Sequence, residues 1–153
     1  MPRIYLDVCC FNRPFGDQKQ ERIRLETEAI LLILNRCNTD TTWQLISSQV
    51  IDAEIAKILD DERRQGVQLS LAEALFKVDL STEIVNRAVG FQSAGIKAYD
   101  ALHIACAESG QADAMLTTDD RLIRRINRSG ITLGTRVVNP VVWVMEMTEA
   151  GEA

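Results

Sequence analysis

Two acids stand at the ends of strand-like runs, where a pair of carboxylates could bind a divalent cation. Asp7 ends the run at residues 3–7, and Asp119 directly follows the run at residues 114–118. Because functional sites of open α/β sheets form beyond the carboxyl ends of the strands, we expect the two side chains to converge there. Each acid also has a simpler interpretation, since Asp is common in strand-terminating turns and at helix N-caps.

Two further acids lie on helices at positions that should be at least partly buried. Glu54 falls in a predicted helix at 49–60, on an i, i+4 line with apolar neighbours, and Asp100 shares a face of a predicted helix at 98–109 with Ile104. A buried acid needs a partner. Carboxylates that meet repel one another, and such a cluster is tolerable mainly around a divalent cation. The four acids therefore predict a Mg²⁺ or Mn²⁺ site.

The elements that must position these acids alternate between short strands and helices. The apolar patterns predict five strands, at 3–7, 43–47, 76–80, 114–118 and 136–139, and helices at 19–37, 49–60, 98–109 and 119–129, with one from Ser81 toward Gly95 and a short one from Pro140. Residues 12–18 are predicted to be a loop, and 61–75 a polar, helix-rich stretch. This alternation predicts an α/β fold, a three-layer α/β/α sandwich with a mostly parallel five-stranded sheet. We expect one domain at 1–148 and a short C-terminal tail at 149–153.

The composition excludes several classes of protein. The chain has 153 residues, is 46% hydrophobic, and has no apolar run near the length that spans a bilayer. The first residues lack the order of a secretory signal, so a cytoplasmic location is expected. In that compartment the four cysteines, at 9, 10, 37 and 106, are predicted to be reduced and mostly buried thiols.

The charge balance argues against binding of nucleic acid by bulk electrostatics. Lys and Arg number 17 against 22 Asp and Glu, a net charge of −5. A local exception is the run TDDRLIRRINR at 118–128, whose arginines could contact phosphates. The run also has the simpler interpretation of a solvated helix with acids at its N-terminus and bases toward its C-terminus, as the helix dipole favours.

Four segments together resemble one known family. They are IYLDVCCFN, SSQVIDAEI, YDALHIACA and LTTDDRLIRR, which carry the four acids in chain order. In this order they resemble the PIN-domain family, the VapC-like metal-dependent ribonucleases, over nearly the whole chain. The resemblance implies an acidic catalytic and metal-binding site at Asp7, Glu54, Asp100 and Asp119. For the fourth acid it favours Asp119 over Asp120, because the family pattern places the acid two residues after a Thr.

The resemblance also implies an activity and partners. The expected reaction is hydrolysis of RNA phosphodiester bonds with Mg²⁺ or Mn²⁺, by an enzyme that would be the toxin of a type II toxin-antitoxin pair. The expected partners are the RNA substrate, a small antitoxin protein with a basic side chain for the acidic pocket, and a second copy of the chain in a homodimer. Substrate contacts are expected from Asn12, Arg13, Thr117, Arg121, Arg124 and Arg125.

The chain departs from the family pattern beside the first acid. The family often has Ser or Thr within two residues of it, where this chain has Val8, Cys9 and Cys10, and Asn12 is the candidate replacement. His103, three residues after Asp100, is interpreted as a packed, hydrogen-bonded histidine, with a metal ligand as the alternative.

Two other functions stay open at this point. A catalytically degenerate PIN fold would act only as an interaction module. A receiver-like or Mg²⁺-dependent phosphotransfer domain would also collect carboxylates at strand ends, although the expected acceptor Asp and late strand-end Lys are missing. Cleavage of labelled RNA and labelling by a phosphoryl donor would discriminate among these functions.

Overall fold

A single parallel sheet forms the centre of the computed structural model, which describes residues 1–72 and 74–151. Its strands are β1 (Arg3–Leu6), β2 (Gln44–Ser48), β3 (Phe76–Val78), β4 (Ala114–Leu116) and β5 (Arg136–Val138), in the order β3-β2-β1-β4-β5. Every neighbouring pair is parallel. The carboxyl ends of β1 and β4 therefore lie next to each other at one edge of the sheet.

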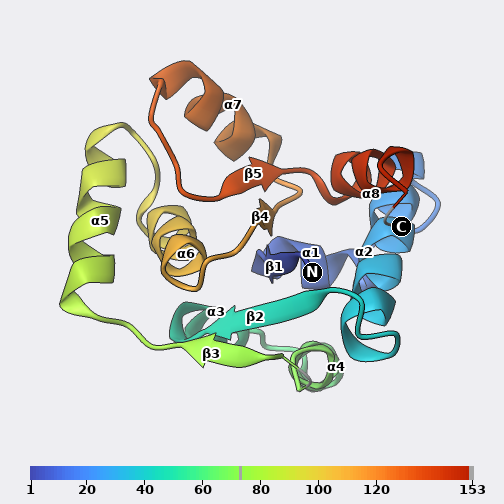
Figure 1. Cartoon of the computed structure of the whole chain (residues 1–153). Coiled ribbons are helices and arrows are strands. Elements are labelled where there is room, and N and C mark those ends of the chain that lie inside the picture. The colour runs from blue at the N-terminus through green and yellow to red at the C-terminus, as the bar shows by residue number, and fades with distance from the viewer. Residues whose placement is uncertain (73, 152–153) are drawn as a thin grey trace.

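Helices cover both faces of this sheet. They are α1 (Val8–Asn12), α2 (Glu21–Asn38), α3 (Gln49–Ile55), α4 (Asp61–Ser70), α5 (Thr82–Ser93), α6 (Ala98–Ser109), α7 (Asp120–Ser129) and α8 (Pro140–Glu149), with a short 3₁₀ turn at Arg13–Phe15. In Figure 1, α2 and α8 lie side by side on one side of the sheet, and α5 and α6 lie together on the other. The predicted three-layer α/β/α sandwich is confirmed, with a sheet that is parallel throughout.

The central strands are buried on both faces, as parallel strands between two helical layers must be. Ile4 and Leu6 of β1 and Met115 and Leu116 of β4 have no exposed surface. A short continuous apolar run is the sequence signature of such a strand, which is why the central strands were predictable. Because both central strands are held rigidly, the residues that follow them are fixed in position.

The segment after β1 differs from the sequence prediction. The strand ends at Leu6, and residues 8–15, predicted in part as a loop, form α1 and the 3₁₀ turn. Asp7 caps α1 by accepting a hydrogen bond from Val8 N, and Pro14 lies at the start of the 3₁₀ turn. Pro suits this position because it lacks the N–H that a helix start leaves unbonded.

The helix that carries Glu54 is shorter than predicted. α3 ends at Ile55 instead of residue 60, because the N–H groups of Lys57 and Ile58 turn back to the carbonyls of Glu54 and Ile55. Asp60 then caps α4 by accepting from Arg63 N at 2.9 Å. Ser48, Ser81 and Pro140 begin their helices as predicted.

Other sequence expectations concern the cysteines and the chain's end. All four cysteines are free, and those at 10, 37 and 106 are buried, as predicted. The predicted tail begins on the last residue of α8, Glu149, and residues 152–153 lie outside the described part. None of the described helices combines the length and apolar character needed to cross a membrane.

Candidate active site

The four predicted acids line one cavity of about 460 Å³ at the carboxyl edge of the sheet. They come from four separate segments: Asp7 follows β1, Glu54 lies on α3, Asp100 lies in the first turn of α6, and Asp119 joins β4 to α7. The expected convergence is therefore present in the structure.

Asp7 is held by hydrogen bonds to both of its carboxylate oxygens. It is 6% exposed; Val8 N donates to Oδ1 at 2.8 Å and the Thr117 hydroxyl donates to Oδ2 at 2.9 Å. Cys9 Sγ lies 3.5 Å from Oδ2 and 3.4 Å from the Thr117 hydroxyl. A hydroxyl beside the first acid is thus supplied by the residue that follows β4, 110 positions away.

Asp119 is tied to Asp7 through the same threonine. Its backbone N–H donates to Thr117 Oγ1 at 3.1 Å, and its Oδ1 accepts from Arg121 N and Leu122 N, which caps α7. One hydroxyl therefore joins the first and fourth acids. Thr117, a predicted substrate contact, has no exposed surface, and its hydroxyl bonds both acids.

Asp120 has a different environment from Asp119. Its carboxylate pairs with Arg22 Nη1 at 2.6 Å on the outside of α7, and it does not line the cavity of the four acids. The hydrogen bond from Arg22 lowers the pKa of the Asp120 carboxyl. The structure thus places Asp119, and not Asp120, with the other three acids.

The pKa of the Asp100 carboxyl is raised by its burial and by the neighbouring carboxylates. Its pKa is raised from 3.8 to about 6, first by burial and then by the charges of Asp7 and Asp119, with Glu54 adding to the effect and His103 opposing it. A carboxyl surrounded by other carboxylates is disfavoured in its charged form. The carboxylates therefore give this part of the cavity an excess of negative charge.

A buried hydrogen-bonded chain lies beneath Glu54. His103 has no exposed surface; its Nε2 bonds Glu54 Oε1, and its Nδ1 lies 2.5 Å from the Tyr5 hydroxyl. Tyr5 in turn lies 2.7 Å from Ser48 Oγ, which already accepts from Ile51 N. This favours donation from Ser48 to Tyr5 and from Tyr5 to Nδ1, which leaves the Nε2 proton for Glu54.

His103 is therefore a packed, hydrogen-bonded histidine, as interpreted from the sequence. One ligand atom each from His103, Asp7 and Glu54 lie within 4.8 Å of one another, but Nε2 is already engaged by Glu54. Such an arrangement orients a carboxylate ligand from behind. Tyr5 and Ser48 were missed at the sequence level, because nothing local relates residues 43 and 98 positions apart.

The rim of the cavity contains further polar groups. Asn12, a predicted substrate contact, lines it, and within the described ranges its buried Oδ1 has no hydrogen-bond partner. Lys57 and Tyr99 also line it, with Lys57 Nζ donating to the Tyr99 hydroxyl at 2.5 Å. The sequence offered no signal for this pair, whose cation faces the acidic cavity.

The predicted arginine contacts separate into two groups. Arg13 forms an ion pair with the buried Glu26, in which Arg13 Nε lies 2.8 Å from Glu26 Oε1. Arg13 nevertheless lines a second cavity, which includes Asp119. Arg121, Arg124 and Arg125 are exposed on α7. Arg121 and Arg124 also line this second cavity, next to the acids.

Comparison with known proteins assigns the chain to a family. The model of the PIN domain matches residues 4–128, which include all four acids, and the chain belongs to the PIN domain family. No curated protein sequence gives a significant match.

One similar solved structure is a crystal structure of VapBC2 from Rickettsia felis bound to a DNA fragment from their promoter. The chain shares 14% identity with a chain of that structure, with a TM-score of 0.55, over 90% of this chain and 98% of the other. At this identity the likeness concerns the fold.

The donor set fits a hard divalent cation. Carboxylate oxygens are the ligands that Mg²⁺ and Mn²⁺ prefer. Asn12, whose buried Oδ1 has no hydrogen-bond partner in the described ranges, also lines this cavity. Burial and then the charges of Asp7 and Asp119 raise the pKa of Asp100, and a cation bound between these acids would oppose the effect of those charges.

Proposed function

We propose that this PIN-domain protein is a metal-dependent endoribonuclease that hydrolyses RNA phosphodiester bonds. The observation that carries the proposal is the meeting of four carboxylates from separate segments in one open cavity. Membership of the PIN family, whose domains are generally nucleases, supports it. A receiver-like domain is not supported by the family match, and a degenerate interaction module would not need to keep the complete acid set.

The acids divide into ligands and an orienting group. Asp7, Asp100 and Asp119 would hold Mg²⁺ or Mn²⁺, and Glu54 would ligate it or orient the attacking water. A bound divalent cation supplies Lewis-acid activation of water and neutralises charge on the scissile phosphate.

The remaining residues hold these groups in place. Thr117 fixes the relative positions of Asp7 and Asp119 through hydrogen bonds at 2.9 and 3.1 Å. His103 holds Glu54 by Oε1, and in the described chain Oε2 makes no hydrogen bond. That second oxygen is therefore available to accept a proton from water in the cavity. Lys57 at the rim can pair with the negative charge of a bound phosphate.

The proposed biological setting is that of a toxin restrained by a small antitoxin. The likeness in fold to a chain of the VapBC2 crystal structure supports it. A basic side chain of such a partner, most naturally an arginine, would pair with the acids and compete with the cation. Its inhibition should therefore weaken as Mn²⁺ rises. A cytoplasmic location and a homodimer complete the proposal.

Cleavage of a labelled single-stranded RNA tests the activity. Wild type should cleave it in Mg²⁺ or Mn²⁺ and not in EDTA, and Asp100→Asn should be inactive under both conditions. Asp120→Asn is the matched control, because it neutralises an acid that lies outside the cavity. Cleavage in EDTA, or full activity of Asp100→Asn, would contradict the proposal.

Expression in a bacterial host tests the biological setting separately. Growth arrest by wild type but not by Asp7→Asn supports a toxin. Normal growth with soluble, metal-active enzyme would remove the toxin interpretation and leave the nuclease.

A further inference from the structure

Four arginines form a single row on α7. Arg121, Arg124, Arg125 and Arg128 are spaced i, i+3, i+4 and i+7, so they share one side of the helix. Like charges at this spacing destabilise a helix. The chain as a whole carries a net charge of −5, so this concentration of positive charge is not a general property of its surface.

These guanidinium groups have no partner within residues 1–72 and 74–151. In those ranges no hydrogen bond or ion pair involves any of the four side chains, whereas Arg13, Arg22 and Arg87 all bind carboxylates. Arg22 pairs with two acids, Glu26 and Asp120. Asp120, in the first turn of α7, offsets the charge of Arg124 in part. No acid of the described ranges forms an ion pair with the four arginines, so an external anion would relieve the remaining repulsion.

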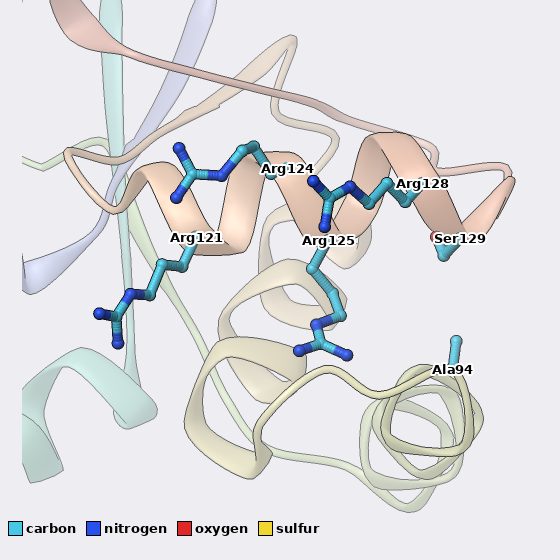
Figure 2. A pocket seen from close by; sticks show the side chains of 6 residues that line it. All are labelled: Ala94, Arg121, Arg124, Arg125, Arg128 and Ser129. Carbon is cyan, nitrogen blue, oxygen red and sulfur yellow. The ribbon is translucent and has the colours of Figure 1, made fainter.

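The row faces a cavity with a wall of small residues. The four arginines line an open space of about 350 Å³ together with Ala94 and Ser129. Figure 2 shows Arg125 reaching from α7 toward the chain near Ala94, between α5 and α6. At the adjacent Gly95, whose φ is +95°, an added Cβ would lie only 2.9 Å from Arg125 Nη1. Because Gly95 has no side chain, the turn after α5 leaves space for the Arg125 guanidinium, and no acid lines this cavity.

The row begins beside the acidic cavity and extends along α7 away from it. Asp119 is the N-cap of the same helix, and Arg121 and Arg124 line the second cavity that includes Asp119. At 1.5 Å per residue, the helix carries the row about 14 Å from Asp119 to Arg128. That length matches about four phosphates of a stacked strand at roughly 3.4 Å each. A strand cleaved at the acids can therefore follow the row.

We propose that Arg121, Arg124, Arg125 and Arg128 form a phosphate-binding track for the RNA backbone flanking the cleaved bond. This rests on the proposed ribonuclease function and adds how the substrate is held. Guanidinium groups suit phosphate because they donate two parallel hydrogen bonds. None of the residues lining the cavity is aromatic, so it provides no platform for base stacking. The track contacts the phosphates of the RNA backbone and does not discriminate between base sequences.

The double variant Arg125→Gln/Arg128→Gln tests the track. Gln has a helix propensity similar to that of Arg, and the change relieves like-charge repulsion. The variant should therefore melt at or above the wild-type temperature. Lys19→Gln/Arg24→Gln is the matched control, because it removes two exposed positive charges that belong neither to α7 nor to the cavity that the four arginines share.

Binding is measured by fluorescence anisotropy with labelled 12-nucleotide RNA, in EDTA and in an Asp100→Asn background. The track variant should bind about tenfold more weakly at low salt, and the slope of log K against log salt should fall by about 0.7 for each phosphate that the protein no longer neutralises. Two RNAs of unrelated sequence should bind more weakly by the same factor. The control pair should change neither quantity.

Cleavage kinetics in Mn²⁺ separate binding from chemistry. The track variant should raise KM and leave kcat unchanged, as expected for loss of uniform binding. Unchanged RNA binding by the track variant would overturn the proposal and point to an acidic protein surface as the occupant, while cleavage by wild type would leave the proposed function intact. Conversely, arginine-dependent binding without any cleavage would refute the nuclease and keep the track.

Discussion

Neutralising Asp100 should stabilise the metal-free protein at neutral pH, even though it destroys the proposed site. The pKa of Asp100 rises from 3.8 to about 6 on folding. A shift of about two units corresponds to roughly 3 kcal/mol at 1.36 kcal/mol per unit. Because Asp100 is only partly buried, solvent screening reduces this, and we expect Asp100→Asn to gain about 1–2 kcal/mol. Asn keeps the volume of Asp, so little of the gain should be lost to repacking.

The gain in stability of Asp100→Asn over wild type should depend on pH. Between pH 3.8 and about 6 the folded protein holds a proton on Asp100 that the unfolded chain has released. Stability of the wild type relative to Asp100→Asn therefore falls as pH rises through this window. The two proteins should have equal stability near pH 3.8, and the variant's advantage should be complete above about pH 7.

Thermal unfolding in EDTA, followed by circular dichroism from pH 4 to 7.5, measures this difference. In a chain of this length each kcal/mol should move Tm by about 2–4 °C. Asp120→Asn is a control of opposite sign, because Arg22 lowers the pKa of Asp120 and the variant removes this ion pair. An Asp100→Asn protein that is no more stable than wild type at pH 7.5, or whose advantage is independent of pH, would refute the repulsion between the carboxylates.

Three further predictions concern metal, the fourth acid and the buried chain. Millimolar Mn²⁺ should raise the Tm of wild type above its value in EDTA by mass action, and should not raise that of Asp100→Asn; identical wild-type scans with and without Mn²⁺ would remove the metal site. Asp119→Asn should abolish RNA cleavage while keeping the α7 cap, since Asn caps as well as Asp, whereas Asp120→Asn should cleave normally in the same assay; the reverse pattern would mean that the wrong acid was chosen. Tyr5→Phe removes the hydroxyl next to His103 Nδ1 and should cost about 1–3 kcal/mol in denaturant unfolding. It should also weaken Mn²⁺ binding or cleavage by about 10–100-fold; a loss of stability with unchanged Mn²⁺ affinity and kcat would make the chain purely structural.

The sequence by itself determined the features that depend on local interactions. Apolar runs identify strands buried on both faces, and Ser48 and Ser81 cap the helices that follow them. The alternation of strands and helices then requires a parallel sheet, which brings residues after β1 and β4 to one edge. The convergence of Asp7 and Asp119 was predictable for this reason, whereas Glu54 and Asp100 were predicted from their helix faces and from the family resemblance.

Only the tertiary structure decided which groups hold the acids. Thr117 binds Asp7 across 110 positions, and Tyr5 meets His103 across 98. No periodicity in the sequence encodes such pairs, because they arise from side chains of different elements that meet only when the layers pack. The same is true of Arg13, whose Nε is bound by Glu26 of α2.

The arginine row on α7 combines both kinds of information. Its spacing was visible in the sequence, but a solvated helix face and a binding surface have the same spacing. The deciding facts are tertiary: no acid of the described chain forms an ion pair with these arginines or lines the cavity that all four share, and the turn at Gly95 leaves space for Arg125. Helix periodicity determines which residues share a face, whereas the packing of neighbouring elements determines what that face meets.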